Sequence, residues 1–447
     1  MLRCCPRTIR RLFITMNHHT FNVLQLATGA GFIEETVIAT LSGEQKIGKH
    51  AGYNSLAIVY AFFTFSNFLA APVVHKLGAR WSLVIGGVGY GLFQVGFLFL
   101  NEPYLYFSSA VLGFCAAIIW TAQGKYLSLN SDENTASKHS GLFWGISQAC
   151  LSCGGIFLFF VFNSGSDTIT DFTIHIIYGV FTSVTVVGII ILSLLRMPNV
   201  CDDNTETAPT LPSPSTVPEM SQMELLKSTI RLCASKRMLL LIVAFMYTGI
   251  ELSFWSGIYP ASIGFTKRLG SNTKSLVGLN AITQGLGQAT GGFLFGILSS
   301  KTAAIGRDRI VMLGALINIL GFVGVYVNFP NDAPLHETQG TGLIEPQIAV
   351  ALVCGYLLGF GDACWNTQIY SQLITNYNKQ SAQAFSLFKF FQSLLTCAAF
   401  WYGSVFDLHI QLIMLTAGAI LGCFCFTLAE RLPISSSENE TSDVHVD

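Results

Sequence analysis

Twelve apolar stretches are the feature that most restricts how this 447-residue chain can fold. Each is about 20 residues long, which is the length needed to cross a bilayer as a helix. Hydrocarbon offers no water to unpaired backbone groups, so spans of this length must be helical. The sequence therefore predicts an all-α membrane protein with twelve transmembrane helices. They are expected at residues 21–41, 52–74, 81–100, 104–129, 141–163, 173–195, 238–262, 275–299, 310–329, 347–374, 382–404 and 409–429.

The composition excludes several classes of protein. Hydrophobic residues make up 51% of the chain and charged residues only 11%, against about 25% charged in a typical soluble domain. A water-soluble domain, a nucleic-acid binder and a disordered regulator are excluded, and the lipid bilayer is the first expected partner. The sequence contains no zinc-ligand pattern, nucleophile elbow or ATP-binding signature, so neither an enzyme nor a metal or cofactor site is predicted.

The basic residues are distributed unevenly between the two sides of the predicted helices. Of the 24 Lys and Arg residues, 18 fall on the side of the N-terminus, 5 fall on the other side, and Lys389 lies inside a span. Because cytoplasmic loops carry an excess of Lys and Arg, both termini are expected in the cytosol. The basic, acid-free start of the chain is also typical of a mitochondrial presequence, and that alternative stays open.

The twelve helices divide into two groups of six. Residues 1–20 are expected to form a cytoplasmic N-terminus, 21–196 one six-helix bundle, 197–237 a cytoplasmic linker, 238–430 a second bundle, and 431–447 a cytoplasmic tail. The linker is rich in Pro, Ser and Thr. Its end, from Ser221 to Cys233, has a capping box and apolar residues at helical spacing. This pattern predicts a short helix on the cytoplasmic leaflet, or alternatively a solvated linker helix.

The fourth and fifth spans are repeated in the tenth and eleventh. A Leu-Gly-Phe triplet at residues 112–114 precedes Trp120 and Gln123, and a second triplet at 358–360 precedes Trp365 and Gln368. A further glutamine follows in each half, Gln148 and Gln392. Six spans per repeat place the two halves in parallel orientation, related by an axis along the membrane normal.

Three of these segments carry a resemblance to a known family. They are Gly361-Asp362-Ala363-Cys364-Trp365-Asn366-Thr367-Gln368, the run from Trp120 to Glu133, and Phe388-Lys389-Phe390 before Gln392. The chain resembles the ion-channel-regulatory, Unc-type branch of the major facilitator superfamily. The resemblance implies twelve helices with either a carrier activity or a channel-modulating role. The first helix is shorter than the family implies, and the loop signature of typical sugar and drug carriers is reduced to Gly78 and Arg80.

Five ionisable side chains fall well inside predicted helices: Glu34, Glu35, Glu251, Asp362 and Lys389. Each costs about 2.5 to 3.5 kcal/mol at the centre of a bilayer, so each should face a cavity or a partner. In the resembled architecture the first, fourth, seventh and tenth helices line a central cavity. Four of the five residues lie on those helices, which predicts a polar cavity between the halves.

The depth of each ionisable residue along its helix predicts which of them lie at the same level in the membrane. Asp362 and Lys389 are expected at the same level, which predicts an ion pair that is either structural or titrating, although Lys389 could also snorkel to the inner interface. Glu35 and Glu251 are expected at matching depths in the two halves. Two facing carboxylates suggest a site that carries a proton or binds a cation, the alternative being a structural carboxylate.

Amide and indole groups surround the same region. The candidate ligand contacts are Trp120, Gln123, Gln148, Trp365, Asn366, Gln368 and Gln392. Amides suit a polar or zwitterionic ligand, and tryptophan can stack on a flat or cationic one. These residue types also serve as interfacial anchors near helix ends.

The predicted cytoplasmic loops after the second and eighth spans suggest a gate. The candidate gate residues are Gly78, Arg80, Gly306, Arg307 and Arg309. Glycine permits a tight turn, and arginine can bond carbonyl groups at a helix C-terminus or a carboxylate on the next helix. The alternative is ordinary anchoring by positive charge.

Two functions follow from the sequence. The first is a secondary carrier that moves an unknown small polar solute by alternating access, with proton coupling through Glu251 as an additional hypothesis. The second is a non-transporting regulatory subunit or trafficking partner of an ion channel.

Overall fold

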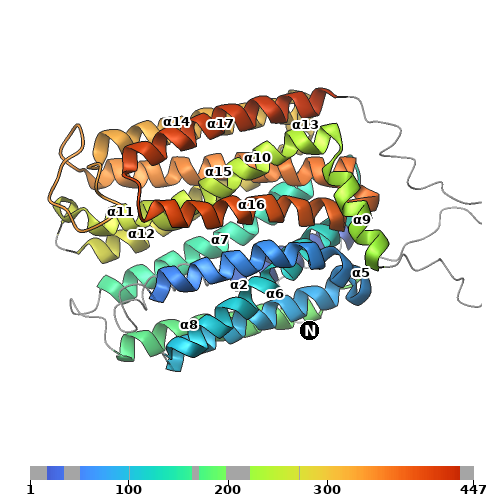
Figure 1. The fold of residues 1–447 in the computed structure, drawn as a ribbon, viewed down its shortest axis with the longest axis horizontal. Coiled ribbons are helices and arrows are strands. Elements are labelled where there is room, and N and C mark those ends of the chain that lie inside the picture. Colours follow the sequence, from blue (N-terminus) through green and yellow to red (C-terminus); the bar gives the residue numbers. More distant parts are fainter. Residues whose placement is uncertain are drawn as a thin grey trace, which may run out of the picture.

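The computed structural model describes residues 18–34, 51–99, 101–163, 171–197, 222–270 and 272–432. In these ranges the chain is helical throughout its regular structure, apart from one isolated β-bridge between Thr266 and Thr338. Two groups of helices lie one above the other in Figure 1, with their axes roughly parallel. The all-α prediction is confirmed.

The N-terminal half is built from five described helices. They are α2 (His18–Glu34), α5 (Ala51–Phe99), α6 (Glu102–Leu129), α7 (Ala136–Asn163) and α8 (Asp171–Ser193). Helix α5 has 49 residues, about 73 Å at 1.5 Å per residue, which is enough for two crossings. The two parts meet at Gly78, where φ is 76°. A residue with a Cβ rarely adopts this conformation, so glycine permits the turn that the sequence predicts there.

The C-terminal half contains the remaining long helices. They are α10 (Lys236–Ser253), α11 (Tyr259–Phe265), α12 (Thr273–Ile297), α14 (Arg307–Asn328), α15 (Ile348–Asn376), α16 (Ser381–Gly403) and α17 (Leu408–Arg431), with the short helices η2 (Phe254–Ile258), η3 (Lys267–Leu269), α13 (Ser299–Ile305) and η4 (Asn378–Gln380). A π-helical turn, η2, joins α10 to α11, so that the three together occupy the predicted seventh span.

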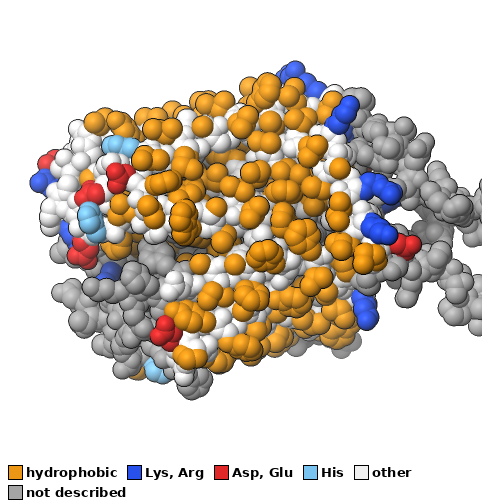
Figure 2. All heavy atoms as spheres, in the orientation of Figure 1, with side chains coloured by type: hydrophobic (Ala, Val, Ile, Leu, Met, Phe, Trp, Pro, Cys, Tyr) orange, Lys and Arg blue, Asp and Glu red, His pale blue; other side chains and the backbone are white. Residues whose placement is uncertain are grey.

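A helix lies at each of the twelve predicted spans. In the described ranges, nine helices are long and apolar enough to cross a membrane, counting α5 once although it holds two crossings. Helix α2 is shorter, with 17 residues, and α12 carries buried amides at Asn280, Gln284 and Gln288. Figure 2 shows hydrophobic side chains over the middle of the molecule and charged ones at its two ends, as expected for a protein surrounded by lipid.

The predicted linker helix is present as α9 (Gln222–Cys233), at one end of both halves (Figure 1). Its buried residues Leu225, Thr229 and Leu232 recur at helical spacing and pack towards α5 and α16. Met223 and Ile230 are exposed on the opposite face. Ser221, the expected N-cap, lies outside the described residues. Contact between α9 and the leaflet stays a prediction, favoured by the exposed apolar face.

The two halves meet along equivalent pairs of helices, α7 against α12 and α5 against α16. At the first interface Gly141 and Gly145 face Gly296 and Gly292. A Cβ atom at Gly292 would lie 2.4 Å from the backbone nitrogen of Gly145, closer than any real contact. Small residues therefore let the two backbones touch, as is common where membrane helices associate.

Replacing Gly292 by alanine is expected to destabilise the protein by about 1 to 3 kcal/mol or more, because the added methyl group overpacks the interface between the halves. Thermal unfolding of the purified protein in detergent measures the effect. Gly179→Ala is the control, since a Cβ there meets nothing within 4 Å. Equal melting temperatures for the two variants would contradict the proposed tight interface.

Candidate functional site

A cavity of about 160 Å³ lies between the two halves. Its lining comes from α2, α5, α6 and α7 of one half and from α10 to α12, α15 and α16 of the other. Leu56, near the start of α5, and Val277, near the start of α12, lie far from the α9 end of the molecule. Gln392 and Asp362 lie near the middle of their helices. The cavity thus extends from the middle of the bundle towards the end opposite α9.

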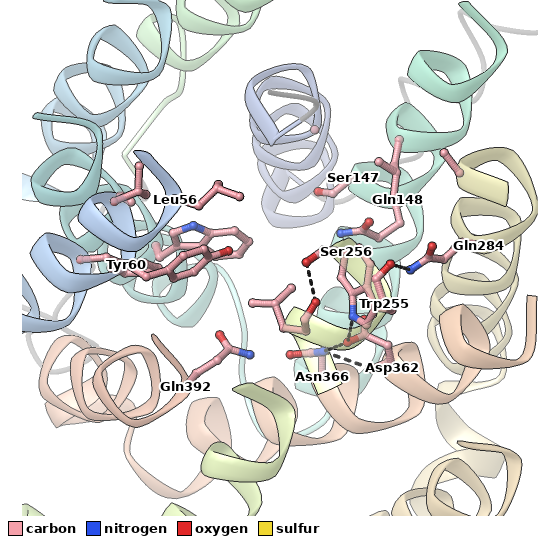
Figure 3. A pocket seen from close by; sticks show the side chains of 18 of the residues that line it. Leu56, Tyr60, Ser147, Gln148, Trp255, Ser256, Gln284, Asp362, Asn366 and Gln392 are labelled. Atoms are coloured by element: carbon pink, nitrogen blue, oxygen red, sulfur yellow. Dashed lines mark hydrogen bonds between the residues drawn. The ribbon is translucent and has the colours of Figure 1, made fainter. Parts of the chain in front are cut away.

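Figure 3 shows the arrangement of the lining. Leu56 and Tyr60 lie on one side, and Trp255, Gln284, Asp362 and Asn366 lie across from them. The first pair comes from the N-terminal half and the second group from the C-terminal half. Aromatic and aliphatic groups dominate the first side, and amide and charged groups the second.

Asp362 is held in the wall of the cavity by two donors. Its Oδ1 accepts hydrogen bonds from Nε1 of Trp255 at 3.2 Å and from Nδ2 of Asn366 at 2.9 Å. Only 2% of Asp362 is exposed. A carboxylate buried in this way depends on such donors, because the cost of removing it from water is otherwise several kcal/mol.

The π-helical turn η2 explains why Trp255 reaches Asp362. Pro260 has no backbone N–H, and the N–H of Tyr259 donates to the carbonyl of Phe254. The carbonyl of Trp255 consequently lacks a donor at the usual positions and accepts from Nε2 of Gln284 at 3.3 Å instead. Turns of this kind occur frequently at functional sites. Here the turn directs one indole into the cavity and fixes one amide of α12.

Lys389 lies at the α9-facing end of the cavity and is 3% exposed. Its Nζ donates to Oε1 of Gln392 at 2.8 Å and lies 4.0 Å from the centre of the Trp120 ring. Since Trp120 belongs to the other half, this cation–π contact joins the two halves. Asp362 and Lys389 line the same cavity, and the ion pair between them stays a prediction.

Glu251 lies behind the cavity wall instead of in it, and it is fully buried. Asn318 donates through Nδ2 to Oε1 of Glu251, and also to the hydroxyl of Tyr247 at 2.9 Å. Gly361 allows this approach, because a Cβ there would lie 1.9 Å from Oδ1 of Asn318. The carboxyl groups of Glu251 and Asp362 are close enough to interact electrostatically. Glu35, its predicted partner, lies outside the described residues.

The other candidate ligand contacts divide into two groups. Trp120, Gln148, Asn366 and Gln392 line the cavity. Gln123, Trp365 and Gln368 are buried elsewhere. The indole of Trp365 packs against Tyr247, with 4.7 Å between ring centres, and Nε2 of Gln368 donates to the hydroxyl of Thr367 at 3.1 Å.

The register of the repeat explains why Trp120 lines the cavity and Trp365 does not. Trp120 lies eight residues after Leu112, whereas Trp365 lies only seven after Leu358. One residue turns a side chain by about 100° around a helix, so the two tryptophans point in different directions. The residue eight after Leu358 is Asn366, which lines the cavity as Trp120 does.

The candidate gate residues make contacts within their own halves. Arg80 donates to the carbonyl of Ser193 at the end of α8, and Arg307 forms an ion pair with Glu430 of α17 at 2.7 Å. Both arginines thus bind one of the two partner types that the sequence predicts. Gly306 has φ 99°, which accommodates the turn before α14, and Arg309 is exposed. A latch role for these residues stays a prediction.

Sequence reasoning missed several lining residues. Trp255, Asn280 and Gln284 are among them, together with the aromatic groups of α5. A signal for part of this set exists, because Asn280, Gln284 and Gln288 recur every four residues on one face of an otherwise apolar helix. The aromatic residues give no such signal, since phenylalanine and tyrosine occur throughout the spans.

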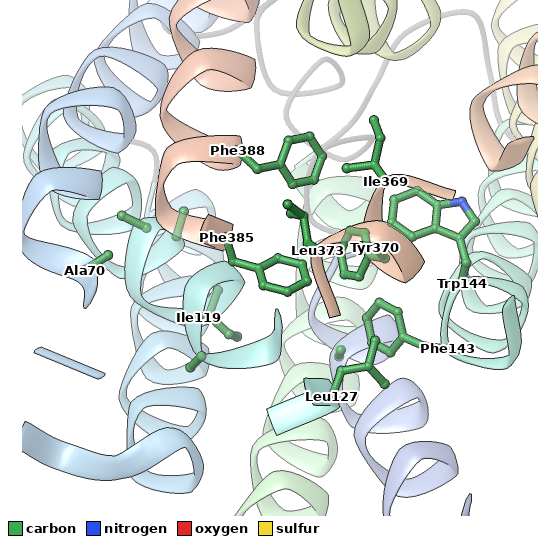
Figure 4. Packing of buried hydrophobic residues seen from close by; sticks show 14 of the residues in the cluster. Ala70, Ile119, Leu127, Phe143, Trp144, Ile369, Tyr370, Leu373, Phe385 and Phe388 are labelled. Carbon is green, nitrogen blue, oxygen red and sulfur yellow. The ribbon is translucent and has the colours of Figure 1, made fainter. Parts of the chain in front are cut away.

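Aromatic side chains of α7, α15 and α16 pack together in Figure 4, and those of α15 and α16 lie on the α9 side of Asn366 and Lys389. We call Phe143, Tyr370, Phe385 and Phe388 the aromatic plug. The ring of Tyr370 lies 5.9 Å from that of Phe143 and 5.0 Å from that of Phe385, measured between centres. Phe385 of one half lies directly on Gly124 of the other. The plug therefore seals the halves together between the cavity and α9.

Comparison with known proteins identifies the family. A model described as "Ion channel regulatory protein UNC-93" matches residues 43–427. The chain belongs to the UNC-93 family. It is 36% identical over 414 residues to the UNC93-like protein MFSD11 of Xenopus tropicalis, covering 90% of this chain and 91% of that protein. It is 24% identical over 463 residues to human protein unc-93 homolog A, covering 95% and 93% of the two chains.

Solved structures with a similar fold are transporters of the major facilitator superfamily. FucP in its outward conformation has a TM-score of 0.64 at 11% identity, covering 92% of this chain and 99% of that one. The proton:xylose symporter XylE has a TM-score of 0.64 at 14% identity, covering 91% and 94%. The fold of this UNC-93 family member is thus that of the major facilitator superfamily, and the protein is an integral multi-pass membrane protein.

The hydrogen bond between Asn318 and Glu251 predicts strong energetic coupling. In a double-mutant cycle of Glu251→Ala and Asn318→Ala, we expect a coupling energy of about 1.5 to 3 kcal/mol, the range for hydrogen bonds to charged groups. Unfolding in a denaturing detergent provides the free energies. The exposed pair Arg268 and Glu345, 2.8 Å apart, is the control and should couple by less than about 1 kcal/mol. A coupling energy near zero for the buried pair would refute the assignment.

Proposed function

We propose that this UNC-93 family member is a secondary carrier that moves a small solute across the membrane by alternating access. The observation that carries the proposal is the cavity between the halves. It contains one acid and one base, Asp362 and Lys389, and the aromatic plug packs between the halves on its α9 side. A cavity closed on one side, at the interface of two repeats, is what alternating access requires.

The plug would be the part of the interface that opens. In this state α6 packs on α16, and α7 packs on α15, through residues near the α9 end. Rocking of one half against the other would separate Tyr370 and Phe385 from Phe143 and Gly124. The contact of Lys389 with Trp120 also spans the halves, so the same movement would change the surroundings of the ammonium group.

Proton coupling would involve both buried acids in turn. Asp362 lines the cavity and Glu251 lies behind it. Oδ2 of Asp362 and Oε2 of Glu251 have no hydrogen-bond partner among the described residues. Protonation removes the cost of burying a charge with an unpaired oxygen. A proton that enters from the cavity would therefore reach Asp362 first, with Glu251 as the second acceptor.

Uptake by proteoliposomes tests the carrier. With a mixture of small metabolites and an imposed pH gradient, the native protein is expected to accumulate at least one solute. Asp362→Asn and Glu251→Gln should abolish accumulation driven by the gradient, because neither variant can release a proton there. Glu337→Gln, at an exposed ion pair with Lys267, should leave accumulation unchanged. Proton coupling through these acids would be refuted if Asp362→Asn and Glu251→Gln accumulate solute as the native protein does. It would also be refuted if only the control variant Glu337→Gln loses accumulation.

Opening of the plug is tested by Gly124→Ala. The added Cβ would lie 2.2 to 2.5 Å from ring atoms of Phe385, so the closed plug is expected to become less populated. Hydrogen–deuterium exchange measured by mass spectrometry should become faster at the start of α16 and the end of α15. Gly264→Ala is the control, since a Cβ there meets only Val277 at 3.8 Å. Unchanged exchange in Gly124→Ala would contradict the gating role.

The second candidate is a regulator of an ion channel, favoured by the description of the family model. In that case no solute would be accumulated under any gradient. Substitutions on exposed apolar positions such as Leu316 and Leu320 of α14 would then change association with a membrane partner, while cavity substitutions would not. Co-purification of the native protein and of these variants from membranes distinguishes the two functions.

A further inference from the structure

The two walls of the cavity differ in chemistry. The N-terminal half contributes six aromatic side chains, Tyr60, Phe63, Tyr90, Phe93, Trp120 and Trp144. The C-terminal half contributes the amide and charged groups Asn280, Gln284, Asp362, Asn366, Lys389 and Gln392. The N-terminal half also contributes Ser147 and Gln148. A solute bound between the halves would therefore meet a ring-rich surface with few polar groups on one side and mostly hydrogen-bonding groups on the other.

Both charged groups of this lining already make polar contacts, and only Oδ2 of Asp362 is without a hydrogen bond among the described residues. Asp362 accepts from Trp255 and Asn366, and Lys389 donates to Gln392 and lies over Trp120. Each is 3% exposed or less. In the described lining their formal charges cancel. A charged solute would bring an uncompensated charge into this lining, which is costly in a site of low dielectric.

Hydrogen-bond acceptors remain free on the polar wall. Nδ2 of Asn366 donates to Asp362, which fixes the orientation of the amide and leaves its Oδ1 without a partner in the described structure. In Figure 3 this oxygen points into the pocket, on the side of Gln392. The hydroxyl of Ser256 donates to the carbonyl of Leu252 at 2.6 Å, so its oxygen can still accept. A solute that binds these two acceptors supplies N–H or O–H donors.

The size of the cavity sets a further limit. Its volume is about 160 Å³, and an apolar cavity of about 150 Å³ in another protein holds a benzene ring. Aromatic pairs favour stacked or edge-to-face contact at ring separations of about 4.5 to 7 Å. The N-terminal wall offers such contacts to a flat solute.

We propose that the solute of this cavity is uncharged and flat, with a ring that packs on the aromatic wall of the N-terminal half and donors on one edge that bind Asn366 and Ser256. The inference rests on the proposed function, since it names the class of solute for the same cavity. It narrows the expectation of a polar or zwitterionic solute to one without formal charge.

A matched series of small probes tests the inference. Benzamide is uncharged, flat and carries N–H donors; N,N-dimethylbenzamide lacks the donors; benzoate, benzylamine and phenylalanine carry an anion, a cation and a zwitterion on the same ring. Binding to the full-length protein in lipid nanodiscs is measured by calorimetry, with empty nanodiscs subtracted. Benzamide should bind most tightly. Tighter binding of any charged probe, or of glucose, or no binding of any probe, would overturn the proposal.

Substitutions test which residues contact the donor edge of the bound molecule and which contact its ring. Ser256→Ala should weaken benzamide by about three- to tenfold, the effect of one lost hydrogen bond, and leave N,N-dimethylbenzamide unchanged. Phe93→Ala should weaken both amides. Trp401→Phe is the control, because Trp401 is 74% exposed on the outside of the bundle. Equal effects of Ser256→Ala on both amides would overturn the predicted donor edge.

Uptake measurements separate this inference from the carrier itself. Binding of benzamide without flux of any solute would refute the carrier function but support the proposal that the cavity binds an uncharged, flat molecule. The opposite outcome is that a pH gradient drives uptake of a sugar or an amino acid that unlabelled solute inhibits and benzamide does not. That result would support the carrier function and refute the proposal of an uncharged, flat solute.

Discussion

The structure depends on pairing charged groups where lipid offers them no solvent. Asp362 and Lys389 are stable in the middle of the bundle because Trp255, Asn366 and Gln392 supply hydrogen bonds and Trp120 supplies a π face. These partners come from four helices and both halves of the molecule. The need to satisfy two charges thus determines how the helices around the cavity are oriented, and it brings the polar groups of the C-terminal half together.

Local backbone chemistry extends this arrangement. A single proline, Pro260, removes one donor from the seventh span, and the resulting π-helical turn leaves the carbonyl of Trp255 for Gln284. The same turn directs the indole of Trp255 to Asp362. Glycine acts in a complementary way, because Gly361 and Gly124 let Asn318 and Phe385 approach another helix closely. The cavity wall and the aromatic plug are therefore built from residues that are unremarkable when taken singly.

Much of the fold follows from the sequence, and part of the site does. Hydropathy predicts a helix at each of the twelve spans, and the motifs around Trp120 and Asp362 point to the family that the comparisons establish. Burial cost correctly directs attention to Asp362 and Lys389. It does not separate Glu251, behind the wall, from Asp362, within it, because burial cost depends on depth, and a step of one residue changes depth by only about 1.5 Å but turns the side chain by about 100°. The repeat likewise does not place Trp365, because its tryptophan lies one residue out of register with Trp120.

The sequence alone determined that this chain crosses a membrane as helices in two similar halves, since apolar length and backbone hydrogen bonding leave no other solution. Only the tertiary structure decided which side chains share the cavity. That choice depends on helix rotation and on contacts between residues hundreds of positions apart, such as Thr64 with Ser393. It also decided that one wall is mainly aromatic and the other mainly polar, because the sequence carries no record of which faces of α5 and α15 line the cavity.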